Sequence, residues 1–260
     1  MSSRLLGLLF SFGPGEAELS LAELTRKTGL PYPTARRLTR ELVKAGALEQ
    51  RPDGRFAIGL RLWQLGTLAP LTESLRAMAL PSMEDLQTAL RQHVQLAILE
   101  GTEAVIIERL SAPRALDLVS QVGGRLPLHC SGAGKVLLSH GGQALAREVL
   151  GGELRRFTAR TITEPGPLRR ELAECRRTGS AMVRGELSEG ADSIATRIMN
   201  GEGRVVAALS VVVAAGSVQP QAVLPSVLTS GLAISRALGW RPGVRVREMP
   251  GELPLTWFGG

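Results

Sequence analysis

Apolar residues between positions 20 and 45 recur with the spacing of two short helices. Ser20 is placed to cap the first helix, and Glu23, three residues later, is placed to complete a capping box. Gly29 suits the left-handed conformation in which a helix often ends. Because proline is tolerated in the first turn of a helix, we predict that the second helix begins at about Pro33.

The second predicted helix has one apolar face and one cationic face. An advance of about 100° per residue places Ala35, Leu38, Leu42 and Ala45 on one side, where they would pack on the first helix. Two helices joined by a glycine-containing turn are typical of the helix-turn-helix motif, whose second helix enters the major groove of DNA. The opposite side carries Pro33, Arg36, Arg37, Arg40 and Lys44.

A solvated helix face is the ordinary explanation for such a run of charges. Here Glu41 is the only acidic residue of the second helix, so few pairs within the helix are available to the cations. We therefore predict that this face binds DNA. We expect Tyr32, Thr34, Arg36 and Arg37 to lie nearest the base edges, and Arg40, Lys44, Arg51 and Arg55 to contact phosphates.

The segments on both sides of the two helices extend this interpretation. Asp53-Gly54 between two strand-like runs is a strong hairpin signal, and it places Arg51 and Arg55 near the tip of a two-stranded wing. Ahead of the motif, leucines from Leu5 onward give a third helix an apolar face to bury. Three helices and a hairpin predict a winged helix-turn-helix.

From residue 63 to residue 93 the pattern is mainly helical. Leucine and methionine from Leu75 to Leu90 have helical spacing, and we predict that Pro81 starts a new helix within the stretch. A long helix between two domains is a frequent dimer contact, whereas a stripe of Met and Leu is also typical of an ordinary core. The sequence leaves both explanations open for Trp63 to Leu75.

Beyond Val94 the pattern changes to short apolar runs typical of strands. Such runs cover 94–100, 101–110, 115–120 and 126–130, and the run 204–213 is apolar enough for a strand buried on both faces. After Ser131–Gly134 we predict a helix at 135–139, with further helices at 143–150, 167–178 and 225–238. The predicted fold class is α+β, ending in an α/β domain with a mainly antiparallel sheet.

These elements predict four parts of the chain. We expect a winged helix-turn-helix over 1–62, a linker helix region over 63–93, a second domain over 94–241 and an irregular tail over 242–260. The chain has 260 residues and a net charge of +7, which suits a polyanionic partner. Positive charge is denser at the front, where residues 1–60 carry nine Lys or Arg against six Asp or Glu.

Cysteine content and the first ten residues bear on the compartment. Only Cys130 and Cys175 are present, which argues against a disulfide scaffold and suits a reducing cytoplasm. The opening apolar run is too short for a transmembrane helix and lacks a convincing cleavage site for a signal peptide. We therefore expect a cytoplasmic protein without a membrane partner.

Two later stretches resemble the IclR family of bacterial transcription regulators. One is RLPLHCSGAGKVLL at 125–138, and the other is GSAMVRGELSEG at 179–190, which continues through Ile194-Ala195 and GRVVAALS at 203–210. The winged helix lies at the expected distance before them, so the resemblance covers roughly residues 1–240. It implies a DNA-binding domain, a linker helix and a GAF-like effector-binding domain. It also implies a homodimer or a dimer of dimers on a partly palindromic DNA operator.

The SGAG sequence after Pro127 has the character of a ligand site. Backbone amides at the start of a helix attract anionic or strongly accepting groups, and small residues let a ligand approach them. Cys130, just before this turn, is predicted to be buried or to line a pocket. By resemblance, positions matching Gly132 and Ala133 contact the effector, and those matching Leu126, Ser193 and Ser210 line the pocket.

Three positions depart from the family pattern. Relatives often carry Asp where this chain has Val183, many have Cys where it has Ser193, and some have a polar residue where it has Val212. Our hypothesis is an effector less polar than a small keto acid, such as an aromatic or longer-chain organic acid. A degenerate pocket is the alternative.

The alternative function is a small-molecule-transforming enzyme that uses the Cys130 thiol. His129 precedes it, but adjacent residues on a strand point to opposite faces and cannot readily form a catalytic pair. Gly132–Lys135 resembles part of a phosphate-binding loop, yet the required earlier glycine and the Ser or Thr after the lysine are missing. Three histidines and two cysteines show no metal-site spacing, so we predict neither metal, cofactor nor catalysis.

Overall fold

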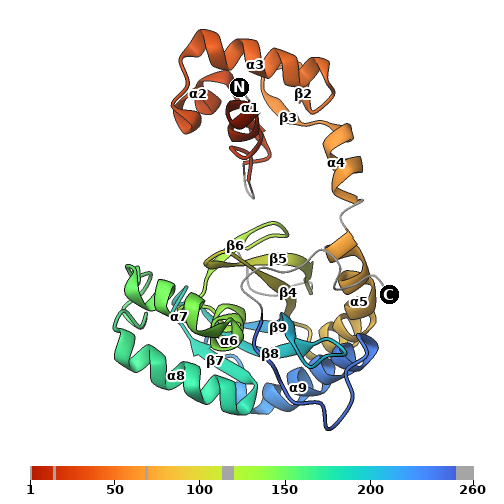
Figure 1. Cartoon of the computed structure of the whole chain (residues 1–260), viewed down its shortest axis with the longest axis vertical. Coiled ribbons are helices and arrows are strands. Elements are labelled where there is room, and N and C mark those ends of the chain that lie inside the picture. Colours follow the sequence, from red (N-terminus) through yellow and green to blue (C-terminus); the bar gives the residue numbers. More distant parts are fainter. Residues whose placement is uncertain (1, 14–15, 68–69, 113–119, 250–260) are drawn as a thin grey trace. The chain divides into compact units, whose positions relative to one another are not determined.

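The computed structural model describes residues 2–13, 16–67, 70–112 and 120–249. Contacts divide the chain into two compact units, Met1–Glu73 and Ser74–Gly260 (Figure 1). The division falls inside the segment 63–93 that the sequence predicts as a linker. Each unit has its own hydrophobic core, so each is described by itself.

The first unit is a bundle of three helices closed by a small antiparallel sheet. The side chain of Ser20 accepts a hydrogen bond from the Glu23 amide, and the Glu23 carboxylate accepts one from the Ser20 amide at 2.7 Å. Gly29 ends this helix with φ of 66°. The predicted capping box and left-handed end are confirmed. The elements of the unit are α1 (Ser2–Leu9), β1 (Glu18–Leu19), α2 (Leu21–Thr28), α3 (Tyr32–Lys44), β2 (Leu48–Gln50), β3 (Phe56–Ile58) and α4 (Leu60–Thr67).

The wing is the hairpin formed by β2 and β3. The amide of Arg51 donates to the carbonyl of Arg55 at 2.8 Å, and Gly54 has φ of 84°, a conformation that favours glycine. The two-residue strand β1 pairs with the other edge of β3, which gives the strand order β1-β3-β2. Beneath the sheet, Leu8, Leu24, Leu38 and Phe56 are buried in one core. The predicted winged helix-turn-helix is confirmed.

The second unit is built on one antiparallel sheet of six strands. The strand order is β6-β5-β4-β9-β8-β7, so β9 lies in the interior and its residues from Val205 to Val213 are all buried, as predicted for this run. The elements are α5 (Pro70–Leu90), β4 (His93–Glu100), β5 (Glu103–Leu110), β6 (Arg125–Pro127), α6 (Gly132–His140), α7 (Gly142–Gly151), α8 (Pro165–Thr178), β7 (Ser180–Arg184), β8 (Ala191–Met199), β9 (Val205–Ala214) and α9 (Pro220–Ala237).

Helices cover both faces of this sheet (Figure 1). On one face, α6 lies against the sheet and α8 packs on α6, with Val136 and Leu172 in the shared core. On the other face, α5 and α9 contribute Met83 and Val227 to a second core. This is the predicted α/β domain with a mainly antiparallel sheet.

The prediction that Pro81 starts a new helix is wrong, because α5 continues through Pro81. Proline removes one hydrogen bond of the helix, but Leu75, Ala79, Met83 and Leu86 all bury their side chains in the same core. Packing of this face outweighs the local preference. The predicted strand at 115–120 falls largely outside the described residues.

The described part of the predicted tail is irregular but anchored. The Arg247 amide donates to the Gly203 carbonyl at 2.8 Å, and Met249 is buried in the core that α6 and α8 share. The Met249 amide also donates to the His140 carbonyl at 2.8 Å. Residues 242–249 therefore belong to the packed structure of the second unit.

Candidate nucleic-acid interface and effector pocket

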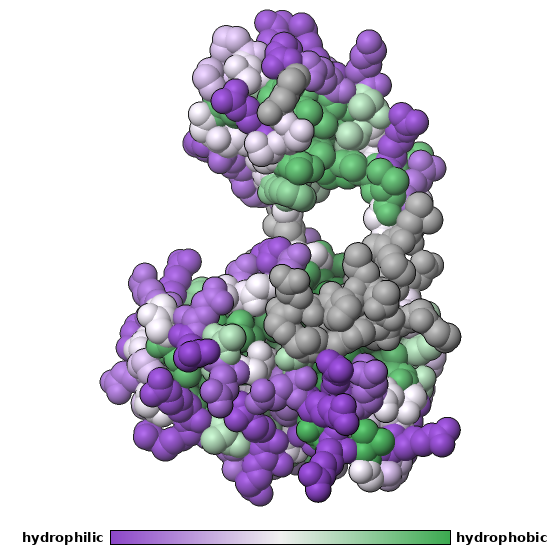
Figure 2. Space-filling model, in the orientation of Figure 1, coloured by the Kyte–Doolittle hydropathy of each residue, from purple (hydrophilic) through white to green (hydrophobic). Residues whose placement is uncertain are grey.

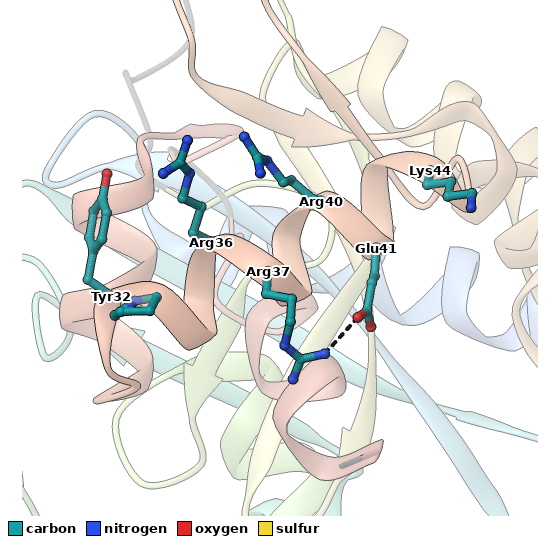
Figure 3. Close-up of a pocket in the computed structure, with 7 residues that line it drawn as sticks. Tyr32, Arg36, Arg37, Arg40, Glu41 and Lys44 are labelled. Atoms are coloured by element: carbon teal, nitrogen blue, oxygen red, sulfur yellow. Dashed lines mark hydrogen bonds and ion pairs between the residues drawn. The ribbon is translucent and has the colours of Figure 1, made fainter.

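The outer face of α3 presents cations and one aromatic ring to solvent. Ala35, Leu38 and Leu42 anchor the inner face of the helix in the core, which fixes the direction of the outer face. Tyr32 is 54 % exposed, and in Figure 3 its side chain extends from the start of the helix, followed by Arg36 and Arg40. A shallow concavity on this face is lined by Tyr32, Pro33, Arg36, Arg37, Arg40, Glu41 and Lys44.

The cations of α3 differ in their partners. Arg37 forms an ion pair with Glu41 one turn later, with Nη1 2.7 Å from Oε1 (Figure 3). Among the described residues, Arg36, Arg40 and Lys44 have no hydrogen-bond or ion-pair partner in the protein. Three exposed positive charges on one helix face are therefore left for a partner outside the chain.

The arginines of the wing are already engaged. Arg51 pairs with Glu18 at 3.1 Å and with Glu49 at 3.5 Å. Arg55 donates to the Glu18 carbonyl at 2.7 Å and pairs with Glu23 at 3.2 Å. These bonds tie the wing to β1 and to the start of α2. Arg55 is half-buried, and so is Thr34 at the start of α3.

In the second unit, small residues form the turn that enters α6, the candidate effector site. The Ser131 hydroxyl caps the helix by accepting from the Gly134 amide at 3.1 Å and donates to the Pro127 carbonyl at 2.7 Å. Amides in the first turn have no acceptor within their own helix, and those of Gly132 and Ala133 bond no described residue. A Cβ at Gly132 would lie 2.4 Å from the Ser193 hydroxyl oxygen and 3.3 Å from Ala195 Cβ.

Sheet register brings the three positions that depart from the family pattern side by side. Val183 on β7 pairs with Ser193 on β8, and Ser193 pairs with Val212 on β9. Directly opposite residues in an antiparallel pair point to the same face. The three side chains therefore form one row, with one hydroxyl between two valines, against the helix start at Gly132.

The neighbouring row on the same face is more polar. Ala195 pairs with Ser210, Ser210 pairs with Gln95 on β4, and Gln95 pairs with Arg109 on β5. Ser210 and Gln95 are both buried. The hydroxyls of Ser193 and Ser210 make no hydrogen bond to a described residue. Unpartnered hydroxyls on a covered face indicate a place where a ligand supplies the missing partner.

Leu126 and Cys130 lie at the border of this region. Leu126 pairs with Ala104 in the sheet and is buried in the core beneath α6. Cys130 is fully buried, and burial, reinforced by the Glu186 carboxylate, raises the pKa of its thiol to about 12. A thiol with that pKa stays protonated near neutral pH and is a poor nucleophile.

The expected strand geometry at His129 and Cys130 is wrong. β6 ends at Pro127, and the two residues lie in the turn that enters α6. His129 is instead fixed by a 2.9 Å contact between its Nε2 and the Arg155 carbonyl, and burial lowers the pKa of its imidazole. The turn arises because α6 needs Ser131 in an extended conformation as its cap.

Lys135 links α6 to helix α8 and to the segment around Glu186. Its side chain is almost wholly buried, and its ammonium pairs with Glu186 at 2.6 Å and with Glu171 of α8. Burial raises the pKa of Glu186, while the nearby Lys135 ammonium acts in the opposite direction. The second oxygen of Glu186 is buried without a hydrogen-bond partner. This cation is internally satisfied, unlike those of α3.

Metal and membrane sites are not evident in the part of the chain that the structure describes. No group of three or more His, Cys, Asp or Glu side chains there is placed to hold a metal ion. No described helix is long and apolar enough to cross a membrane.

Three residues of these two candidate sites were not predicted from the sequence as site residues. Glu41 lines the concavity on α3, and its position four residues after Arg37 is the signal for the ion pair. Gln95 and Arg109 join the Ser210 row only through strand register. The visible signal for Gln95 is a polar side chain between apolar neighbours on a buried strand.

Comparisons with known proteins agree with both halves of this description. The model of the IclR helix-turn-helix domain matches residues 3–52, and that of the bacterial transcriptional regulator IclR C-terminal region matches residues 71–237. The regulator XynR of Escherichia coli is 31 % identical over 91 % of this chain and 96 % of its own length. The Pca regulon regulatory protein of Pseudomonas putida is 30 % identical over 91 % and 81 %.

A solved structure is similar over nearly the same range. The IclR homologue of Microbacterium hydrocarbonoxydans, crystallised with 4-hydroxybenzoate, has 36 % sequence identity and a TM-score of 0.84. The match covers 91 % of this chain and 98 % of that one.

Proposed function

This chain belongs to the IclR family of DNA-binding transcription regulators with a ligand-binding C-terminal domain, and from this premise we propose which residues bind each partner. The face of α3 binds the operator, with Tyr32, Thr34, Arg36 and Arg37 near base edges. The phosphates are contacted by Arg40, Lys44, Arg51 and Arg55. The observation that carries this proposal is that Arg36, Arg40 and Lys44 are exposed and have no partner among the residues that the structure describes.

The wing arginines act in this proposal partly through the shape of the wing. Arg55 holds β1 and the start of α2, so its replacement by alanine loosens the wing and weakens binding to all DNA sequences alike. The test is a binding titration of the purified chain against genomic fragments at moderate ionic strength. Absence of any preferred fragment, with and without effector, would contradict the assignment of α3.

The proposed effector is an aromatic or longer-chain organic acid. The row Val183, Ser193, Val212 offers one hydroxyl between apolar walls, which suits a ring better than a small keto acid. The homologue described with 4-hydroxybenzoate supplies the first probe. Tight binding of glyoxylate or pyruvate in calorimetry, with aromatic acids inert, would contradict this effector class.

The effector site consists of Gly132 and Ala133 at the start of α6, with Leu126, Cys130, Ser193 and Ser210 around them. Gly132→Ala tests this placement, because the added Cβ meets the Ser193 hydroxyl at 2.4 Å and fills the space there. We expect loss of effector binding with operator binding retained when no effector is present. Ser193→Ala is the companion variant: it removes the hydroxyl without filling the space, so we expect a smaller loss of effector affinity than in Gly132→Ala.

A homodimer, or a dimer of dimers, is the proposed assembly. The exposed large apolar side chains of the first unit include Leu6 of α1, Phe10 just after it, and Leu60, Trp63 and Leu65 of α4. Figure 2 shows hydrophobic side chains gathered on a face of this unit. Sedimentation equilibrium with Trp63→Arg as the interface variant tests this assembly, and a wild-type monomer at micromolar concentration would contradict it.

The protein acts in this proposal as a non-catalytic regulator in the cytoplasm. The protonated state expected of the Cys130 thiol speaks against the enzyme alternative. Cys130→Ser separates the two functions, since a regulator keeps operator binding and effector response when the nucleophile is gone. Loss of a chemical conversion of the effector, with binding intact, would favour the enzyme.

A further inference from the structure

Arg109 on β5 places a positive charge on the covered face of the sheet, and no described carboxylate neutralises it. Its Nη1 donates to the Ser120 carbonyl, and its Nη2 lies 3.5 Å from His93 Nδ1. Its Nε is buried and bonds no described residue. Among the described residues no carboxylate pairs with this guanidinium. Buried or half-buried charges in proteins are normally paired, so the missing partner calls for an explanation.

The adjacent carboxylate does not serve as that partner. Glu108 points to the opposite face of β5, where both Nε and Nη2 of Arg76 donate to its Oε2, the latter at 2.6 Å. Its Oε1 accepts from the backbone amide of Arg109, not from the guanidinium. Leu96 and Ala97 of β4 pair with Glu108 and Ile106, so Ile107 is an extra residue on β5 at this register shift.

Strand register links Arg109 to the effector site. Arg109 pairs with Gln95, and Gln95 pairs with Ser210, so the three share one row and one face. Strands lie about 4.8 Å apart, which puts the Cα atoms of Arg109 and Ser210 at about 10 Å, a gap that an extended arginine and a ligand ring can bridge. The Gln95 amide donates to the Ser120 hydroxyl at 2.9 Å and so holds the same segment that the guanidinium contacts.

Polar groups thus stand at both ends of this covered face. One end is the start of α6 with the Ser193 hydroxyl, and the other is the Arg109 guanidinium. Ser210 and Gln95 lie between them in the Arg109 row, and Ala195 and Val212 flank Ser210. A guanidinium pairs most strongly with a carboxylate, because two parallel N–H groups match its two oxygens.

We propose that Arg109 is the specificity residue that binds the carboxylate of the effector, while the far end of the ligand reaches the serines and the start of α6. This inference rests on the proposed acid-sensing function and identifies the group that distinguishes an acid from its uncharged analogue. Gln95 and His93 act as positioning residues, since they hold the segment and the guanidinium that the carboxylate meets.

The test compares two ligands of the same shape, 4-hydroxybenzoate and 4-hydroxybenzamide, by calorimetry on the full chain at pH 7.5. We expect the wild type to prefer the acid by about 10- to 100-fold, the range of a charge-assisted hydrogen bond. In Arg109→Met the preference falls to near unity, while affinity for the amide changes by less than about threefold. Arg109→Lys retains part of the preference, because it keeps the charge and loses the planar fork.

Arg76→Met is the matched control, since it removes an arginine that pairs with Glu108 on the opposite face. It should leave the preference unchanged. Operator binding without effector and the melting temperature identify variants that fail to fold. If Arg109→Met does not fold, the test compares the acid-over-amide preference of the wild type with that of Arg109→Lys.

The outcomes separate this inference from the proposed function. An acid bound equally well by wild type and by folded Arg109 variants overturns the role of Arg109 and leaves the acid effector standing. Equal affinity of the wild type for acid and amide also overturns the role of Arg109 and leaves the acid effector standing. If the wild type binds the amide or other neutral rings and no acid, both the effector class and this inference are wrong, whereas operator binding is unaffected.

Discussion

The cations on α3 of the first unit and the lysine of α6 in the second unit are held in opposite ways. On α3, Arg36, Arg40 and Lys44 are exposed and lack partners among the described residues. In α6, Lys135 is only 1 % exposed and pairs with the carboxylates of Glu186 and Glu171. A charge taken out of water needs an oppositely charged partner inside the protein, whereas an exposed charge is solvated by water and stays available to an external partner. Exposed cations without partners suit the binding of DNA, and a buried, paired lysine suits stabilisation of the fold.

The largest effect expected from this contrast is on Lys135. Replacing it by methionine leaves the buried carboxylate of Glu186 without its cation, so the free energy of unfolding should fall by about 3–5 kcal/mol. Urea unfolding at pH 7.5 measures the loss. Arg177→Met is the control, because Arg177 and Glu174 form an exposed pair, for which we expect less than about 1 kcal/mol. Equal losses in the two variants would show that Lys135 is not a structural cation.

The converse effect is expected for the unpaired cations of α3. Arg36→Ala should relax sequence preference by about 1–3 kcal/mol, the range of one bidentate contact to guanine, with little change in stability. Arg40→Ala should weaken specific and random duplexes alike and lower the salt slope of binding by about 0.9. Fluorescence anisotropy at several salt concentrations measures both. Arg147→Ala removes an exposed cation of α7 and serves as control, and identical losses for Arg36 and Arg40 on every duplex would contradict their separate roles.

His140 extends the contrast, because it is a buried base that stays neutral. Burial first, and then the nearby guanidinium groups of Arg197 and Arg176, lower the pKa of His140 to about 4. Below pH 6.5 the unfolded chain takes up a proton that the folded chain resists, so stability is lost as the pH falls from 6.5 toward 4 and is unaffected above that window. At pH 5 the loss should be about 2 kcal/mol.

The measurement for His140 is the difference in unfolding free energy between pH 7.5 and pH 5. Wild type should lose about 2 kcal/mol more than His140→Gln over this interval, since glutamine does not titrate. The variant also loses the 3.0 Å contact of His140 Nδ1 with the Val136 carbonyl, so its stability is lower at both pH values. The same pH dependence in both proteins would mean that another group causes the acid loss.

The same two regions differ in how far their structure can be predicted from the sequence. The capping box of Ser20 and Glu23, the left-handed Gly29 and the hairpin at Asp53-Gly54 are local signals within four residues, and all three are confirmed. The partners of Arg51 and Arg55 could not be predicted in this way. They depend on the pairing of the two-residue strand β1 with β3, which joins residues more than thirty positions apart.

Predicting the pocket requires long-range information throughout. Resemblance supplied Gly132, Ser193 and Ser210, but their rows with Val183, Val212, Gln95 and Arg109 follow from the register of five strands. The prediction that Pro81 starts a new helix was wrong for a related reason, because burial of one helix face in the core outweighs the local preference of proline. Local rules therefore describe the DNA-binding unit well, and packing decides the ligand-binding unit.

The smallest expected effect concerns the one α3 cation that has a partner. Glu41→Gln removes the 2.7 Å ion pair of Arg37, which is exposed, so stability should change by no more than about 0.5 kcal/mol. Removal of a negative charge beside phosphates should raise affinity for random duplex and steepen the salt slope by up to about 0.9, because the repulsion between the Glu41 carboxylate and the phosphates is lost. Glu16→Gln makes the same charge change away from α3, where Glu16 pairs with Lys27, and should have the weaker effect. If Glu41→Gln instead reduces preference for the operator without changing the salt slope, the ion pair orients Arg37 toward a base, and Glu41 belongs to the recognition surface.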